Sequence, residues 1–128
     1  MPLDRRAQGQ KNRLLGRWGE AAVASDLRKK GWRILAAGYR CRFGEIDLIA
    51  TDGTFLSFIE VKLRKNTQHG TAAEAVNLRK RERLQSTAQL YLAAHPSKLQ
   101  PRFDVAEVYA PDGLETVSPS ISYIENAF

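Results

Sequence analysis

The sequence predicts an α/β fold in which a mixed central sheet is flanked by helices, in the order helix, three strands, helix, strand. Two segments with apolar residues at helical spacing predict the helices. Short apolar segments rich in Ile, Val, Leu and Phe predict the strands. The 128 residues contain no internal repeat, and a chain of this length is typical of one domain.

The N-terminal part of the chain is expected to hold an arm and the first helix. Residues 1–13 are polar and basic without periodicity, so we predict a flexible basic arm ahead of a single domain over residues 14–128. A helix is predicted from about Leu14 to Lys30, because Gly31 is suited to the left-handed conformation that ends many helices.

The middle of the chain predicts three strands, and the last two form a hairpin. Residues 32–37 are interpreted as a strand and residues 38–43 as a connection. The stretch GEIDLIATDGTFLSFIEVK, residues 44–62, holds two apolar segments on either side of Asp52-Gly53. This dipeptide is a strong signal for a tight turn. We therefore predict a hairpin with a two-residue loop.

Charged residues inside this hairpin require an explanation, because burying charge is unfavourable. A two-residue loop pairs Thr51 with Thr54 and puts Asp47 opposite Phe58. Side chains alternate between the two faces of a strand. Glu60 then lies diagonally across from Asp47 on the same face, about 7–8 Å away. A three-residue loop would reverse the faces.

The predicted face carries several charged groups: Asp47, Glu60 and Lys62, with Glu45 across from Glu60. Carboxylates at this separation repel each other unless a proton or a cation joins them. Mg²⁺ prefers such oxygen ligands and keeps waters or substrate phosphates as its other ligands. Lys62 would orient a water or stabilise charge on a phosphate. The alternative is a salt-bridged cluster of Glu60 with Lys62 or with a nearby arginine.

The C-terminal half is predicted to hold the second helix and two further strands. Asn77 is the expected N-cap of a helix that reaches about Ala94, and Pro96 prevents its continuation. Residues 102–110 are interpreted as a strand and residues 121–124 as a weaker one.

Each predicted helix carries one charged residue on its apolar face. We expect Glu20 to point at the hairpin carboxylates; the alternative is a buried glutamate whose hydrogen bonds are satisfied. Lys80 either reaches a phosphate at the edge of the site or extends to solvent from the edge of the core. We call the residues that share each of these helix faces a stripe. Its other members are Gly16, Val23, Ala24 and Leu27 in the first helix, and Leu84, Thr87, Ala88 and Tyr91 in the second.

The charge of the chain indicates a polyanionic partner. The formal net charge is +6, and clustered basic residues attract phosphate chains. A solvated basic surface is the alternative. No apolar run approaches the roughly 20 residues of a membrane helix, so no membrane contact is expected. Cys41, the one cysteine, excludes an internal disulfide and fits the reducing cytoplasm.

The sequence leaves the roles of Glu45, His69 and Asp104 open. His69 either lines the site from a loop or is an isolated, exposed histidine without a role. Asp104 alternates with apolar neighbours and is therefore expected to face away from the core. A salt bridge with Arg102 is the simplest arrangement for it there.

The acidic pattern resembles a known nuclease signature. Asp47, followed by Glu60-Val61-Lys62 on the next strand, is similar to the D…ExK motif of the restriction-endonuclease-like, or PD-(D/E)XK, nuclease superfamily. Glu20 resembles the additional acid of archaeal Holliday-junction resolvases within that superfamily. More closely, the chain resembles the YraN family of small bacterial proteins of uncharacterised function. The blocks that carry this closer resemblance are GRWGEAAVASDLRKKGW, CRFGEIDLIATDG, FIEVKLR, EAVNLRKRERLQSTAQLYL and RFDV.

The superfamily resemblance implies a sheet with a metal site at one end and Mg²⁺- or Mn²⁺-dependent hydrolysis of phosphodiester bonds. By the same resemblance, Glu20, Asp47 and Glu60 correspond to metal ligands and Lys62 to the catalytic lysine. Ile46 stands where the superfamily name has proline. We therefore expect a metal-dependent endonuclease acting on structured or branched DNA. The alternative is a non-catalytic nucleic-acid-binding protein with the same fold.

The nucleic acid is expected to be held through its backbone, since basic side chains position phosphates without specifying sequence. An enzyme that cuts a branched junction needs two active sites and hence a homodimer. The residues expected to bind the backbone are Arg17, Arg40, Arg42, Arg64 and Lys80.

Overall fold

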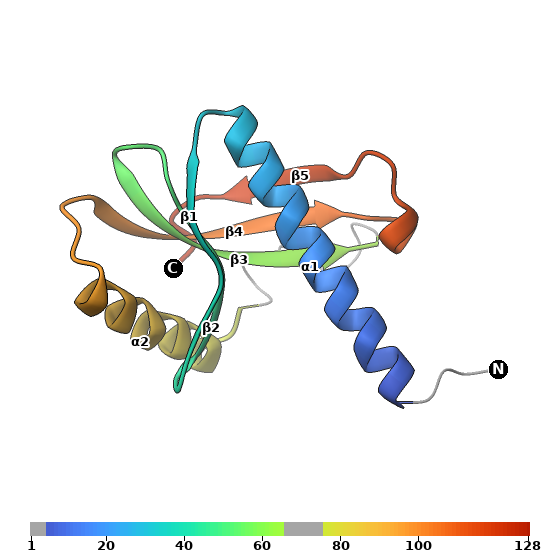
Figure 1. Ribbon diagram of the computed structural model, residues 1–128, viewed down its shortest axis with the longest axis horizontal. Coiled ribbons are helices and arrows are strands. Elements are labelled where there is room, and N and C mark those ends of the chain that lie inside the picture. Colours follow the sequence, from blue (N-terminus) through green and yellow to red (C-terminus); the bar gives the residue numbers. More distant parts are fainter. Residues whose placement is uncertain (1–4, 66–75) are drawn as a thin grey trace.

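The computed structural model describes residues 5–65 and 76–128. Within them, helices and a five-stranded mixed sheet follow the predicted order, which confirms the α/β class (Figure 1). The strands lie in the spatial order β1-β2-β3-β4-β5, where β3 and β4 are parallel and the other neighbours are antiparallel. No helix of this described part is long and apolar enough to cross a membrane. The elements are α1 Arg5–Lys29, β1 Arg33–Cys41, β2 Gly44–Thr51, β3 Phe55–Arg64, α2 Leu78–Ala94, β4 Gln100–Tyr109, the short 3₁₀ helix η2 Gly113–Glu115, and β5 Ser120–Ile124.

Helix α1 begins nine residues earlier than the sequence predicts. It starts at Arg5 rather than near Leu14, so residues 5–13 are helical where a flexible arm was expected. This segment is rich in Arg, Gln and Lys, which have high helix propensity. It also contains no proline to stop the helix. Residues 1–4 lie outside the described part of the chain.

The capping signals place two helix ends correctly. Gly31 has a φ of +88°, and the N–H of Trp32 donates to the carbonyl of Leu27 at 3.0 Å. This is the Schellman arrangement that satisfies the last carbonyls of a helix. At the start of α2, the Asn77 side chain accepts a hydrogen bond from the N–H of Lys80 at 2.9 Å.

Strand β1 is longer than expected. It runs to Cys41 and includes Gly38, which keeps a φ of +67° inside the strand. Glycine adopts such a conformation without steric strain, so the strand continues with a local distortion instead of ending. The connection predicted over residues 38–43 is therefore reduced to a turn at residues 42–43.

The pairing of β2 with β3 differs from the predicted register by two residues. Thr51 pairs with Leu56 rather than with Thr54, and Asp47 is therefore not opposite Phe58. The Asp52 carboxylate accepts hydrogen bonds at 2.9 Å from the N–H groups of Thr54 and Phe55. These bonds close a loop that is longer than two residues. A shift of two residues keeps every side chain on its predicted face, whereas a shift of one reverses them.

The apolar core lies on both faces of the sheet. In β3, Phe58 packs in the cluster that contains the apolar face of α2, and Ile59 packs in the cluster that contains α1. Helix α1 approaches β3 closely at Gly19, where a Cβ would lie 3.1 Å from the side chain of Leu63. The buried residues of α2 are the four that its stripe predicts: Leu84, Thr87, Ala88 and Tyr91.

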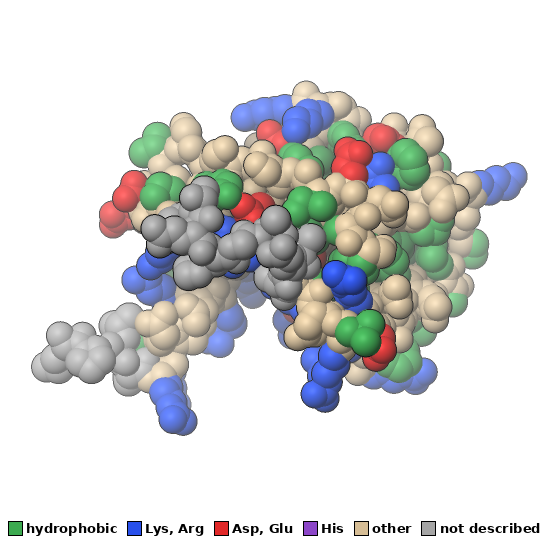
Figure 2. Space-filling model, turned by 180° about the vertical axis from the view of Figure 1, so that it is seen from behind, with side chains coloured by type: hydrophobic (Ala, Val, Ile, Leu, Met, Phe, Trp, Pro, Cys, Tyr) green, Lys and Arg blue, Asp and Glu red, His purple; other side chains and the backbone are tan. Residues whose placement is uncertain are grey.

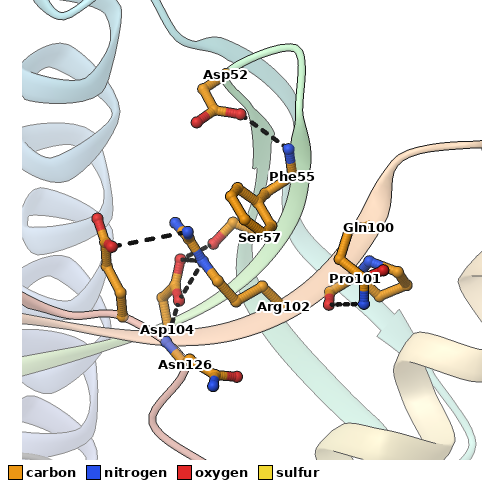
Figure 3. Close-up of polar contacts among 9 residues, drawn as sticks. Asp52, Phe55, Ser57, Gln100, Pro101, Arg102, Asp104 and Asn126 are labelled. Carbon is orange, nitrogen blue, oxygen red and sulfur yellow. Dashed lines mark hydrogen bonds and ion pairs between the residues drawn. The ribbon is translucent and has the colours of Figure 1, made fainter.

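Asp104 is the centre of a polar network that joins β3, β4 and the C-terminal segment (Figure 3). It is buried, with 4% of its surface exposed, so the expectation that it faces away from the core is wrong. The predicted salt bridge with Arg102 is present at 2.9 Å. Ser57 donates its hydroxyl to the same carboxylate, and the N–H of Asn126 donates at 2.8 Å. These partners satisfy the carboxylate, so Asp104 is a structural residue.

Candidate functional site

The candidate site lies where strands β2 and β3 separate. Their pairing covers only residues 48–51 and 56–59; beyond it, β2 pairs with β1 and β3 pairs with β4. At this fork the Asp47 carboxylate accepts a hydrogen bond from the N–H of Val61 at 2.8 Å. The fork opens the sheet, so side chains of β2 and β3 border one hollow.

Three carboxylates meet at the fork, and we call them the acid cluster. Glu20 of α1 and Glu45 and Asp47 of β2 each place one ligand oxygen within 4.8 Å of the others. Glu20 thus points at Asp47, in the direction that its place on the helix stripe predicts. Carboxylates this close repel one another unless a proton or a cation lies between them.

The acid cluster retains a proton more strongly than isolated carboxyl groups do. Burial, together with the charges of Glu60 and Glu20, raises the pKa of Asp47 to about 8, although the N–H of Val61 acts in the opposite direction. Burial also raises the pKa of Glu20, and the charge of Glu45 adds to this increase. At neutral pH the cluster therefore holds a proton or a cation in place of its full negative charge.

Glu60 is held by two lysines. Its side chain is only 7% exposed, and Oε1 lies 2.5 Å from the Nζ atom of Lys80 and 3.5 Å from that of Lys62. Burial and the ammonium group of Lys80 lower the pKa of Lys62. Burial opposes protonation of Lys80 too, but its ion pair with Glu60 raises the pKa of Lys80. The salt-bridged alternative for Glu60 is therefore present, with Lys80 as the nearer partner.

The closest group of carboxylates differs from the ligand set that the superfamily resemblance implies. That set is Glu20, Asp47 and Glu60, whereas Glu45 is the third member of the close group in the structure. Glu60 borders the same hollow as Asp47 and Glu45, but its carboxylate is paired with lysines. Glu45 lies two residues before Asp47, so strand alternation places both on one face. Its distance from Glu20 depends on how α1 docks, which no local pattern reveals.

Three of the five residues expected to bind the nucleic-acid backbone lie at the surface. Arg17 and Arg40 line a hollow beside the acid cluster. The Arg40 side chain is 78% exposed and forms an ion pair with Glu45 at 3.2 Å. The Arg42 guanidinium lies over the ring of Phe43, 4.8 Å from its centroid. All three guanidinium groups are therefore open to a ligand from solvent.

The other two residues of that set are engaged within the protein. Lys80 pairs with Glu60, as described above. Arg64 lies on the face of β3 that also carries Lys62, and its Nε atom is 3.9 Å from the carboxylate of Glu107. Its Nε and Nη2 atoms are buried and lack a hydrogen-bond partner among the described residues. Arg64 consequently does not present its guanidinium to a ligand on the surface.

Two hollows meet at the acid cluster, and Glu45 and Asp47 border both. The first has a volume of about 420 Å³ and lies between α1 and the β1–β2 hairpin. The second has a volume of about 500 Å³ and lies between the fork and the start of α2. Lys and Arg side chains lie on both sides of the depression between the N-terminal part of α1 and α2 (Figure 2). Three arginines outside the set predicted to bind the nucleic-acid backbone also line the hollows: Arg13, Arg79 and Arg83.

Among the described residues, His95 does not contribute to the candidate site. His69 lies outside the described residues. His95 follows the last turn of α2, and its ring stacks on Tyr91 with the centroids 4.3 Å apart. His95 therefore packs against its own helix, at the opposite end from Lys80.

Comparisons with known proteins find one family. The model described as "Uncharacterised protein family UPF0102" matches residues 19–108, a range that includes the acid cluster, Glu60 and both lysines. A UPF0102 protein of Clostridium botulinum is 43% identical over 122 residues, which cover 91% of this chain and 95% of that protein. One of Symbiobacterium thermophilum is 50% identical over 104 residues, 80% of this chain and 88% of that protein. One of Herpetosiphon aurantiacus is 51% identical over 80 residues, and the match spans 62% of this chain and 64% of that protein.

Proposed function

Because the chain belongs to the uncharacterised protein family UPF0102, the YraN family that its sequence resembles, its activity has to be inferred from the site, and we propose a metal-dependent endonuclease. Its substrate in this proposal is structured or branched DNA, and its reaction is hydrolysis of phosphodiester bonds. The observation that carries the proposal is the meeting of Glu20, Glu45 and Asp47 at the fork, with Glu60 and Lys62 beside them.

The acid cluster fits a hard divalent cation. All its donor atoms are carboxylate oxygens, which Mg²⁺ and Mn²⁺ prefer, and they already lie within 4.8 Å of one another. The raised pKa of Asp47 shows that its negative charge is poorly compensated by the protein. Glu20, Glu45 and Asp47 would hold the ion, and Glu60 borders the same hollow. When bound, such an ion lowers the pKa of a water and neutralises charge on a phosphate.

The residues of the chain have separate roles in this proposal. Lys62 lies beside Glu60, where its ammonium group would orient the attacking water and stabilise negative charge on the phosphate. Its lowered pKa favours transfer of a proton. Lys80 holds Glu60 in a fixed position through the 2.5 Å ion pair. The exposed arginines near the fork would hold the substrate backbone.

A non-catalytic nucleic-acid-binding protein is the second candidate function. One observation favours it: two lysines already pair with the buried carboxylate of Glu60. The charge of Glu60 is therefore compensated without an ion. In this case the basic hollows would bind a polyanion and the acids would only stabilise the fork.

A cleavage assay separates the two functions. The substrates are linear, flap and four-way-junction DNA, each with Mg²⁺, Mn²⁺ or chelator. We expect metal-dependent cleavage that is abolished in Asp47→Asn and reduced about 100-fold or more in Lys62→Met, with Asp52→Asn in the hairpin loop as a charge-matched control. Binding of all substrates without cleavage of any would refute the endonuclease. If a junction is cleaved, sedimentation should show the homodimer that two incisions require.

A further inference from the structure

We infer that one nucleic-acid strand crosses the acid cluster and continues on both sides of it, so that the site takes an internal phosphodiester rather than a chain end. This inference rests on the proposed function and adds to it the path of the substrate. Phosphates on one side would contact Arg13 and Arg17 of α1, and those on the other side Arg79 and Arg83 of α2.

The α1 side of this path is built from two arginines separated by one helical turn. Arg13 and Arg17 lie four residues apart on α1 and therefore share a face of the helix. Both line the first hollow, which Glu45 and Asp47 also line. Within the part of the chain that the structure describes, neither forms an ion pair with a carboxylate. They are thus available to an anion from solvent.

The α2 side repeats this arrangement. Arg79 and Arg83 also lie four residues apart, in the first turns of α2, and both line the second hollow. No ion pair to a carboxylate involves either of them among residues 5–65 and 76–128. By contrast, Lys80 between them is paired with Glu60. The two unpaired arginines are therefore exposed at the surface of the second hollow, whereas the paired Lys80 is partly buried.

The position of the acid cluster between the two hollows implies a strand that passes through. Carboxylates repel a phosphate, so a polyanion approaches them only where neighbouring cations compensate. A chain end that stopped at the cluster would use the cations of one hollow only. Here two unpaired arginines line each hollow, and Glu45 and Asp47 border both. A strand bound in both hollows places the phosphodiester between them at the acids.

Binding in chelator tests the path without depending on cleavage. The probes are a fluorescent single strand of about 40 nucleotides, several times the roughly 4–16 nucleotides of a typical single-strand site, and the same strand closed into a circle. The variants are Arg13→Gln/Arg17→Gln and Arg79→Gln/Arg83→Gln. The matched control is Arg28→Gln/Arg33→Gln, which removes two exposed arginines away from both hollows. Circular dichroism melts check that every variant is folded.

Each double variant that removes the two arginines of one hollow, called a hollow variant below, should lose two phosphate contacts. For single strands each contact contributes about 0.7 to the slope of log affinity against log salt, so the slope should decrease by about 1.4. The affinity at 0.1 M salt should fall about 25-fold. The control variant should change neither quantity, and the circle should bind as tightly as the linear strand.

Three other outcomes would contradict the inference, and each has a different consequence for the proposed function. If only one of the two hollow variants weakens binding and the circle binds poorly, the strand ends at the acid cluster. This overturns the inference and the internal position of cleavage, whereas metal-dependent hydrolysis at a chain end would still be seen with linear DNA in the cleavage assay. If neither variant differs from the control, the strand lies elsewhere, and the inference is wrong. If the unmodified protein binds neither probe, the proposed function fails together with it.

Discussion

Replacing Asp47 with asparagine should stabilise the metal-free protein at neutral pH. The pKa of Asp47 is about 8 in the folded state, against an ordinary value of 3.8. A raised pKa means that the folded state is favoured when the group is protonated. This contribution is complete below about pH 3.8 and is lost as the pH rises toward 8. Asparagine resembles the protonated acid, because its amide oxygen can still accept from the N–H of Val61.

The size of the effect follows from the interval between the two pKa values. Each pH unit above 3.8 costs about 1.4 kcal/mol of folding free energy while the folded-state carboxyl keeps its proton. At pH 7 the difference reaches up to about 4 kcal/mol. Asp47→Asn avoids this cost, so its free energy of unfolding should exceed that of the unmodified protein at pH 7. The two proteins should converge near pH 4.

Urea unfolding in chelator, repeated between pH 4 and pH 8, measures this difference. Asp52→Asn is the control, because the pKa of Asp52 is shifted in the opposite direction. Hydrogen bonds from the N–H groups of Phe55 and Thr54 lower the pKa of Asp52, so its contribution is present above pH 3.8 and disappears as the pH falls. If Asp47→Asn is less stable than the unmodified protein at pH 7 and shows the same pH dependence, Asp47 is ionised in the fold. The reasoning about the acid cluster would then be refuted.

Three further predictions concern the metal, the lysine pair and the polar network. Mg²⁺ or Mn²⁺ at about 100 times Kd should add about 2.7 kcal/mol to the free energy of unfolding; thermal melts should show the gain in the unmodified protein, and its absence in Asp47→Asn. Lys80→Met should lower Tm, because the buried carboxylate of Glu60 then keeps only Lys62, 3.5 Å away; an unchanged Tm would show that this ion pair contributes no net stability. Asp104→Ala should destabilise the fold by about 3–5 kcal/mol by leaving Arg102 without its buried partner, while strand binding by the folded variant stays unchanged; a loss of binding in that folded variant would contradict the structural role of Asp104.

The spacing of apolar residues predicted which side chains around the site share a face, because the faces of a helix or a strand depend only on local geometry. The stripe of α2 gave the side chains that the helix buries, and alternation along β3 placed Glu60 and Lys62 on one face. The predicted hairpin register was wrong, since the Asp52 side chain closes a longer loop than the Asp-Gly signal indicates. The side chains were nevertheless assigned to the correct faces of the sheet, because the predicted register differs from the observed one by an even number of residues.

The contacts that decide the chemistry could not be predicted in this way. Glu45 joins Glu20 only because α1 docks at the fork, and Lys80 reaches Glu60 only because α2 begins beside β3. These pairs are distant in sequence, and propensity or spacing says nothing about their separation. Arg64 was predicted to bind the nucleic-acid backbone, but its guanidinium lies beside Glu107.

The parallel pairing of β3 with β4 sets the order in which this protein can fold. Ten residues of β3 pair with β4, which follows only after the whole of α2 has been made. Synthesis adds about 5–20 residues per second, so β3 leaves the ribosome seconds before its partner strand exists. During that interval its apolar edge, LSFIEV, is open to pairing with other chains. Glu60, Lys62 and Arg64 interrupt or flank this segment, and such charges discourage aggregation. Charges in and beside this segment should therefore reduce its tendency to pair with other chains before β4 has been made.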